Sequence, residues 1–284
     1  MSARTQTRNT LKALALPSLL VSVAAGGAHL LNRFQEAQIF APLRFPHGGV
    51  WDPAAADLAV EDVFFQSEDD VRLHAWWIER KRSRGTVLYC HGNNGNISTR
   101  IDALVQLGRL GLNVFAFDYR GYGRSEGEPS EQGLYRDVRA AYDNLCGPLG
   151  QPSTRILLLG HSLGGAVAID LALHRPVAGL VVQSSFTQIR DMARNLAPWG
   201  PLGWLTSNQF RSIEKVPEIE VPKLFLHGGD DPTVPVEMGR RLYEAAREEK
   251  DWYEIDRAGH NDLHLQGGMR YFWRLYRFSR RCLS

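Results

Sequence analysis

Short, continuous apolar runs that alternate with helical patterns are the feature that most constrains the fold of this chain. Such runs lie at Thr86–Cys90, Asn113–Phe117, Arg155–Leu159, Val177–Val182 and Lys223–Leu226. A strand that is apolar at successive positions suits a parallel sheet, because helices there bury both faces of the strand. The sequence therefore predicts an α/β domain with a mostly parallel central sheet and helices on both of its faces.

Other elements fill the spaces around these runs. Val60–Gln66 and Arg72–Ile78 flank the turn signal Glu68-Asp69-Asp70, which predicts a hairpin, and Trp252–Ile255 predicts a last strand. Helices are predicted at Thr99–Leu107, Glu131–Leu145, Leu163–Leu173, Val236–Ala246 and Leu265–Arg281. No linker-like break interrupts the alternation, so residues 58–284 are predicted to form one domain.

The first 31 residues have the pattern of a membrane or export segment. Arg4, Arg8 and Lys12 precede Ala13–Leu31, which contains no charged residue. A basic start followed by an apolar run is typical of a membrane anchor, or of a secretory signal cut near residues 23–25. Both readings put the remaining chain outside the cytoplasm. An N-terminal extension on a cytoplasmic protein is the third reading, and the Pro- and Gly-rich residues 32–57 are interpreted as a linker.

Composition excludes several classes of protein. The 33 basic and 31 acidic residues give a net charge of +2, so no global field attracts nucleic acid. Cys90, Cys146 and Cys282 are too few and too scattered for a disulfide framework or a zinc cluster. No feature indicates an obligate protein partner.

The pattern Gly-x-Ser-x-Gly occurs twice, and its context separates the two copies. Ser162 directly follows an apolar run and directly precedes a helical pattern. Strand, sharp turn and helix form the context of a nucleophile elbow, which presents a serine hydroxyl at a helix N-terminus. Ser125 is followed by Glu128, Pro129 and Ser130, which do not continue a helix, so it is interpreted as a loop residue.

A nucleophilic serine needs a histidine base, and the base needs a carboxylate to orient it. Asp231 follows the run Lys223–Leu226 and is predicted to be that acid, with Asp230 as its rival. His260 follows the last strand and is predicted to be the base, with His264 as its competitor. A metal site from His260 and His264 lacks a third ligand with a supporting motif.

An oxyanion hole needs two backbone N–H groups. The residue after the nucleophile, Leu163, supplies one of them. The loop after Thr86–Cys90 is rich in Gly and Asn, and Asn93 is its best candidate for the second donor. An ordinary Gly/Asn turn is the alternative interpretation of this loop.

At these residues the sequence resembles the α/β-hydrolase superfamily, in the branch of BEM46-like and alpha/beta hydrolase domain proteins related to serine aminopeptidases. The resemblance rests on Tyr89–Asn96, Phe117–Ser125, Gly160–Gly165, the Asp231 loop and Ala258–His260. It implies the α/β-hydrolase fold, the order Ser, Asp, His, and often an N-terminal membrane segment. It also implies a cap, so residues 184–221 are predicted to form a short helical lid that either lines an acyl-binding wall or only packs on the core.

The predicted function is a serine hydrolase for a carboxylic ester, thioester or amide, which acts through an acyl-enzyme and requires no metal or organic cofactor. A thioesterase for lipidated proteins is an alternative within this class. A catalytically silent, membrane-associated binding module is an alternative outside it. Arginines at helical spacing after residue 269 give the last helix a basic face, which is either solvated or touches an anionic membrane.

Overall fold

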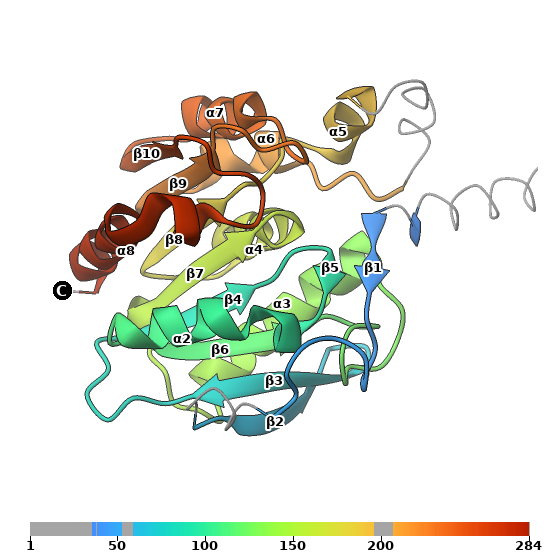
Figure 1. Ribbon diagram of the computed structural model, residues 1–284. Helices are drawn as coiled ribbons and strands as arrows, with labels where there is room; N and C mark the ends of the chain where they lie inside the picture. Colours follow the sequence, from blue (N-terminus) through green and yellow to red (C-terminus); the bar gives the residue numbers. More distant parts are fainter. Residues whose placement is uncertain (1–35, 38, 53–58, 196–206, 284) are drawn as a thin grey trace, which may run out of the picture.

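The computed structural model describes residues 36–37, 39–52, 59–195 and 207–283. Within these ranges eight strands form one sheet in the order β10-β9-β8-β7-β4-β6-β3-β2 (Figure 1). The strands are Glu61–Gln66 (β2), Arg72–Ile78 (β3), Thr86–Cys90 (β4), Asn113–Asp118 (β6), Ile156–His161 (β7), Gly179–Gln183 (β8), Lys223–Gly228 (β9) and Lys250–Ile255 (β10).

The sheet is parallel from β6 to β10, and its other edge is antiparallel. β4 lies between β6 and β7, and all three strands run in the same direction. β2 pairs antiparallel with β3, which in turn pairs antiparallel with β6. Every residue of β4, β6, β7, β8 and β9 is buried, as expected for strands covered on both faces. The prediction of an α/β domain with a mostly parallel sheet is confirmed.

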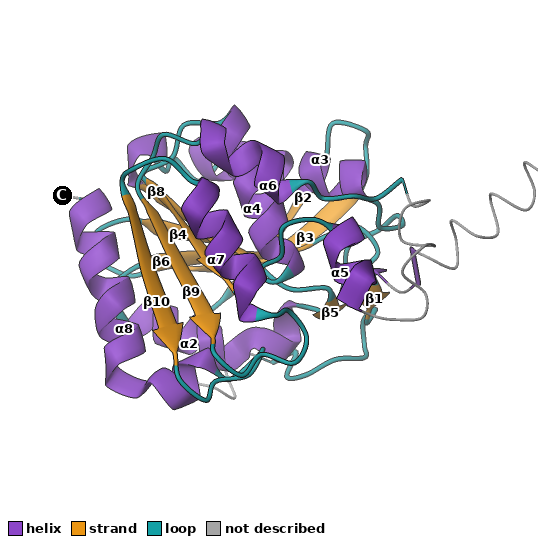
Figure 2. Ribbon diagram, turned by 90° about the horizontal axis from the view of Figure 1, so that it is seen from above, coloured by secondary structure: helices purple, strands orange, loops and turns teal. Residues whose placement is uncertain are grey.

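Helices form one layer on each face of the sheet (Figure 2). Because side chains alternate along a strand, Leu88 and Leu158 face one layer, whereas Tyr89 and Leu159 face the other. The first layer contains α3 (Glu131–Cys146), α4 (Leu163–His174), α6 (Ser212–Lys215) and α7 (Val236–Ala245). The second contains α2 (Ile101–Arg109) and α8 (Leu263–Cys282).

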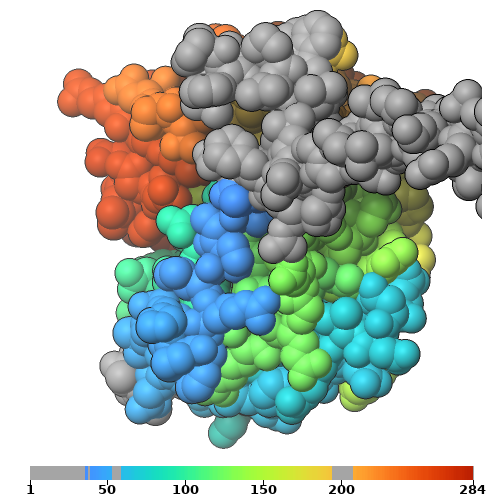
Figure 3. Space-filling view, turned by 90° about the vertical axis from the view of Figure 1, so that its right-hand side faces the viewer, coloured from blue at the N-terminus to red at the C-terminus, as the bar shows by residue number. Residues whose placement is uncertain are grey.

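Residues 39–51, within the predicted linker, pack against two loops of the domain. β1 (Ala41–Pro42) pairs with β5 (Asn94–Gly95), and Phe40 is buried. Further along, the Phe45 N–H donates to the Gly123 carbonyl. Figure 3 shows this segment in blue against the green loop that follows β6. The segment therefore supports the Gly/Asn loop after β4 as well as connecting to the domain.

Three predicted segments fall wholly or partly outside the described ranges, and the linker, 32–57, is described only at 36–37 and 39–52. Residues 1–31 are outside them, and inside them no helix has the length and apolar character needed to cross a bilayer. The predicted lid, 184–221, is described except for 196–206, and it contains α5 (Ile189–Asn195) and α6. The Glu131 carboxylate accepts hydrogen bonds from two N–H groups within the lid, those of Gln209 and Phe210, at 2.6 and 2.9 Å.

A buried ion pair ties the loop after β6 to α3. Arg120 donates to both carboxylate oxygens of Asp137, and its two terminal nitrogens also donate to Asp69. Asp137 is fully buried and Arg120 nearly so, so water cannot replace either partner. The pair therefore holds the loop that lies beneath residues 39–51.

Removing one charge of this pair should destabilise the fold. An Asp137→Asn variant leaves the Arg120 guanidinium buried with one carboxylate fewer, which should lower the free energy of unfolding by about 3 kcal/mol. Urea unfolding measures this loss. The control is Asp143→Asn, because Asp143 pairs with Arg175 on the surface and its loss should cost under about 1 kcal/mol. Equal effects of the two substitutions would contradict this account.

Candidate active site

Ser162 stands in a strained turn between β7 and α4. Its backbone angles are φ 55° and ψ −118°, outside the conformations that a residue with a side chain prefers. The following residue, Leu163, begins α4, so the serine lies at the positive end of the helix dipole. This is the strand–turn–helix context that the sequence predicts for a nucleophile elbow.

Two glycines make room for the turn. A Cβ on Gly160 would meet the carbonyl oxygen of Gly164, and a Cβ on Gly164 would meet the carbonyl oxygen of Cys90. In each case the obstacle is backbone, which cannot rotate away as a side chain can. The Gly-x-Ser-x-Gly pattern at this site is therefore a packing requirement, because the first turn of α4 lies directly against the backbone at the ends of β7 and β4.

Asp231 and His260 come from the loops after β9 and β10, and they meet at the C-terminal ends of these parallel strands. The His260 Nδ1 lies 2.8 Å from Oδ2 of Asp231. The other carboxylate oxygen, Oδ1, accepts hydrogen bonds from the N–H groups of Thr233 and Val234, at 2.8 and 2.9 Å. The carboxylate is thus held by its own turn on one side and directed at the imidazole on the other.

The hydrogen bond of this pair decides which nitrogen of a neutral His260 ring carries the proton. Burial acts to raise the pKa of Asp231, but the hydrogen bonds from His260 and from the Val234 N–H outweigh it, so the pKa lies below its usual value. The ionised carboxylate only accepts hydrogen bonds, so His260 Nδ1 donates the proton between them. Nε2 of the neutral ring then carries a lone pair, as a general base requires.

The described residues leave the hydroxyl of Ser162 and Nε2 of His260 without hydrogen-bond partners, including each other. Their loops are nevertheless adjacent, because His161, which directly precedes Ser162, packs its ring 4.9 Å from the His260 ring. A nucleophile and its base are often apart in a ligand-free enzyme and close when substrate binds. The structure therefore brings the three predicted residues to the C-terminal ends of the parallel strands, and a hydrogen bond joins Asp231 to His260.

The two oxyanion candidates flank this serine. Leu163 is the first residue of α4, so its N–H has no intrahelical acceptor. Gly92 lies against the nucleophile, since a Cβ on it would be 3.4 Å from the Ser162 Cβ, and Asn93 follows it. The Asn93 carbonyl accepts from the Tyr122 hydroxyl at 2.8 Å, and its side-chain amide donates to the Ile39 carbonyl at 3.1 Å. These bonds hold the Gly/Asn loop and leave the Asn93 N–H without an acceptor in the described part of the chain.

The competing residues have other surroundings. Ser125 is buried, and its hydroxyl donates to the Asp118 carbonyl and accepts from the His74 N–H. Asp230 is exposed to solvent. His264 lies in the first turn of α8, as the sequence indicates. Among the described residues, no group of three His, Cys, Asp or Glu side chains is arranged to hold a metal ion.

Two histidines at the site were not singled out from the sequence. The neutral His161 donates from Nε2 to the His260 carbonyl at 2.9 Å, which holds the loop of the base. His227 donates from Nε2 to the Val234 carbonyl at 2.9 Å, which holds the loop of the acid. Both residues lie at or near the C-terminal end of a buried strand, beside a predicted catalytic residue, and that position is the signal that could have identified them.

His161 should make the fold sensitive to acid. Burial and the neighbouring His260 lower the pKa of His161 to about 3 from the usual 6.5. Between these pH values the unfolded chain binds a proton that the folded protein does not, so stability falls as the pH drops from 6.5 toward 3. A His161→Gln variant keeps a donor for the His260 carbonyl but does not titrate. It should lose less stability on acidification, by up to about 1.4 kcal/mol per pH unit.

Urea unfolding of the wild type and of His161→Gln at roughly pH 7, 5.5 and 4.5 would measure this difference, because the steps of about 1.5 and 1 pH units each test the slope. The two stabilities should converge as the pH falls. Parallel pH dependences would show that His161 does not remain neutral in the folded protein.

Comparisons with known proteins agree with this fold and site. A family model described as "Serine aminopeptidase, S33" matches residues 81–214. The chain is 36% identical to the alpha/beta hydrolase domain-containing protein WAV2 of Arabidopsis thaliana, over 88% of this chain and 89% of that one. It is 32% identical to the protein bem46 of Schizosaccharomyces pombe, over 92% and 90%. The chain therefore belongs to the α/β-hydrolase superfamily, in the branch that contains bem46.

Solved structures give the same result for the fold. The esterase Pf2001 of Pyrococcus furiosus matches with a TM-score of 0.73 and 25% identity. The match covers 87% of this chain and 98% of the esterase. Membership of a hydrolase family with an esterase among the structural neighbours supports a hydrolytic activity.

Proposed function

We propose that this protein is a serine hydrolase that cleaves carboxylic esters through an acyl-enzyme. The observation that carries the proposal is the hydrogen bond of 2.8 Å from His260 Nδ1 to Asp231, on the loop beside the strained Ser162. That bond leaves Nε2 of the imidazole as a proton acceptor, on a loop that adjoins the turn of Ser162 at the N-terminus of α4. A serine at a helix N-terminus, an oriented base and a buried acid are the parts that nucleophilic acyl transfer needs.

The first half of the reaction forms the acyl-enzyme. Oγ of Ser162 attacks the ester carbonyl carbon while His260 Nε2 takes the hydroxyl proton. The carbonyl oxygen becomes an oxyanion and accepts hydrogen bonds from the Leu163 and Asn93 N–H groups. The C–O bond to the leaving group then breaks, and His260 returns its proton to the departing alcohol. Throughout, the Asp231 carboxylate stabilises the imidazolium without taking its proton.

The second half releases the acid. A water molecule gives a proton to His260 Nε2 and attacks the acyl carbon, which forms a second oxyanion in the same place. Collapse of this intermediate breaks the bond to Ser162 Oγ, and the imidazolium protonates the serine. The products are a carboxylic acid and the free enzyme, so atoms and protons balance without any cofactor.

An ester is favoured over an amide or a thioester by one comparison. The structural neighbour at 25% identity is an esterase, and its match covers 98% of that chain. A thioesterase uses the same steps with a sulfur leaving group, so the site geometry does not separate the two. Matched butyryl substrates separate them, namely the p-nitrophenyl ester, the thiophenyl ester and the p-nitroanilide. For each substrate, kcat/KM is divided by the rate constant of its uncatalysed hydrolysis. The proposal expects this ratio to be highest for the oxygen ester.

A fluorophosphonate probe tests the class itself. The proposal expects the folded wild-type protein to be labelled covalently and the Ser162→Ala protein to remain unlabelled. Circular dichroism and thermal unfolding establish that both proteins are folded. A folded wild type that neither reacts with the probe nor hydrolyses any of the three substrates would instead favour a silent binding module.

A further inference from the structure

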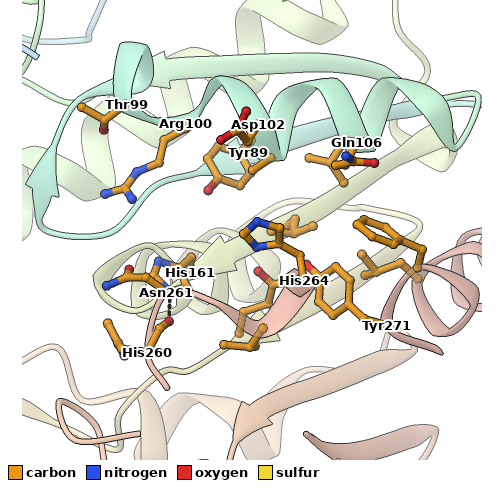
Figure 4. A pocket seen from close by; sticks show the side chains of 17 residues that line it. Tyr89, Thr99, Arg100, Asp102, Gln106, His161, His260, Asn261, His264 and Tyr271 are labelled. Carbon is orange, nitrogen blue, oxygen red and sulfur yellow. Dashed lines mark hydrogen bonds between the residues drawn. The ribbon is translucent and has the colours of Figure 1, made fainter. Parts of the chain in front are cut away.

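A cavity of about 270 Å³ lies between α2 and α8, beside the loop that carries His260 (Figure 4). It lies on the face of the sheet that these two helices cover, and its lining includes Tyr89 and Leu159 from β4 and β7. His161 and His260 contribute to its wall, whereas Ser162 does not. The cavity is thus next to the proposed catalytic site but separate from the nucleophile.

Tyr89 supplies a hydrogen-bond donor to the wall of the cavity. Tyr89 as a whole is only 4% exposed, yet its hydroxyl has no hydrogen-bond partner in the described part of the chain. Figure 4 shows the hydroxyl end of the ring directed into the space between the two helices. Burial raises the pKa of this phenol, so at neutral pH it keeps its proton. The hydroxyl therefore faces the cavity as an unpaired donor, which an acceptor on a bound molecule can use.

Positive charge lies at the same end of the cavity. The Arg100 guanidinium lines it, and its buried Nε has no acceptor among the described residues. A terminal nitrogen of the same group donates to the Asn94 carbonyl, which fixes the side chain. His264 also lines the cavity without a described partner. The one carboxylate in the lining, Asp102, belongs to an exposed residue, so solvent screens it more than the buried groups.

Apolar side chains form much of the remaining wall, which also includes Thr99, Gln106, Gln183 and Asn261. Leu107, Leu159, Leu263, Phe272 and Leu275 line it, from both helices and from β7. A ligand that fits both parts carries an acceptor-rich anionic group at one end and a short hydrocarbon chain at the other. The volume is just below the range typical of pockets for drug-sized molecules, so the ligand is smaller than those.

We propose that this cavity binds a small carboxylate with a short apolar chain, with the carboxylate accepting hydrogen bonds from Tyr89 and Arg100. Arginine and a phenolic hydroxyl are suited to this group, because charge-assisted hydrogen bonds to a carboxylate are stronger than neutral ones. The bound molecule lies against His161 and the loop of His260, so its occupancy is coupled to the position of the proposed base. The binding site does not depend on the proposed hydrolytic function.

Binding of butyrate tests this proposal. The full-length Ser162→Ala protein is titrated with butyrate and, separately, with butyramide and 1-butanol, and ligand-observed NMR gives each Kd. Because the variant lacks the nucleophile, failure of the hydrolase proposal does not affect the result. Butyrate should bind at least about tenfold more tightly than the two neutral analogues. Equal binding of butyrate and butyramide would overturn the proposal, whatever the variants show.

Variants then locate the site. Tyr89→Phe and Arg100→Gln should each weaken butyrate binding about tenfold. Ala103→Leu should also weaken it, by filling the cavity without removing a donor, and it serves if Tyr89→Phe does not fold. Arg109→Gln, an exposed arginine in the same helix, is the matched control and should leave the Kd unchanged. Unchanged binding in the three cavity variants would place butyrate elsewhere and refute the site.

Discussion

Replacing Ser162 with alanine should lower kcat for p-nitrophenyl butyrate by roughly 10⁶-fold. The reason is that the substitution removes the only atom that the proposal uses to attack the ester, while the oxyanion donors and the base remain. The residual rate then reflects binding and oxyanion stabilisation alone. Initial rates at saturating substrate measure the effect, and thermal unfolding establishes that the variant keeps its fold.

Ser125→Ala is the matched control, because Ser125 has the second Gly-x-Ser-x-Gly pattern of this chain. Its hydroxyl bonds the Asp118 carbonyl and the His74 N–H, so its loss should cost about 1 kcal/mol of stability. kcat should not change. If Ser125→Ala abolished turnover and Ser162→Ala did not, the nucleophile would be wrongly assigned.

Replacing Asp231 with asparagine should lower kcat by about 10⁴-fold. Asp231 accepts the proton of His260 Nδ1, which leaves Nε2 with a lone pair. An asparagine amide group can donate to Nδ1 instead, and the proton then moves to Nε2, where it prevents the imidazole from accepting the serine proton. The protein should still fold and bind substrate, so the loss should appear in kcat more than in KM.

The neighbouring Asp230→Asn substitution tests the assignment directly. Asp230 is exposed and one residue away, so its charge has nearly the same distant effect on the site. Its loss should leave kcat and KM unchanged. Similar losses in both variants would mean that long-range charge, and not the tautomer of His260, accounts for the effect of Asp231.

Local sequence patterns were sufficient to predict the central elements of the fold and the positions of the candidate residues. Runs buried on both faces predicted β4, β6, β7, β8 and β9, because burial on two sides leaves few polar positions along a strand. The elbow was predictable because it is a local structure, in which Ser162 needs glycines on both sides. The sequence also favours Asp231 over Asp230 as the acid. In the structure the turn around Asp231 directs the Thr233 and Val234 N–H groups at its Oδ1.

Local sequence patterns do not predict contacts between segments that lie far apart in the sequence. Residues 39–51 had the composition of a linker, yet they pair with the Gly/Asn loop 54 positions away, where Asn93 bonds the Ile39 carbonyl. The last helix was predicted from Leu265, but it begins at Leu263 and is interrupted at Gly268, whose φ is 48°. The role of His161 depends on a bond to a residue 99 positions later, and no local pattern contains it.

The most direct test of the central claim is the mass of the covalent intermediate. Wild-type protein is mixed with excess p-nitrophenyl butyrate, quenched in acid during the first turnover, digested and analysed by mass spectrometry. The account predicts that one butyryl group is added, and that it lies on the peptide containing Ser162 and on that serine. Turnover of the ester with no acylated peptide, or with the acyl group on another residue, would contradict it.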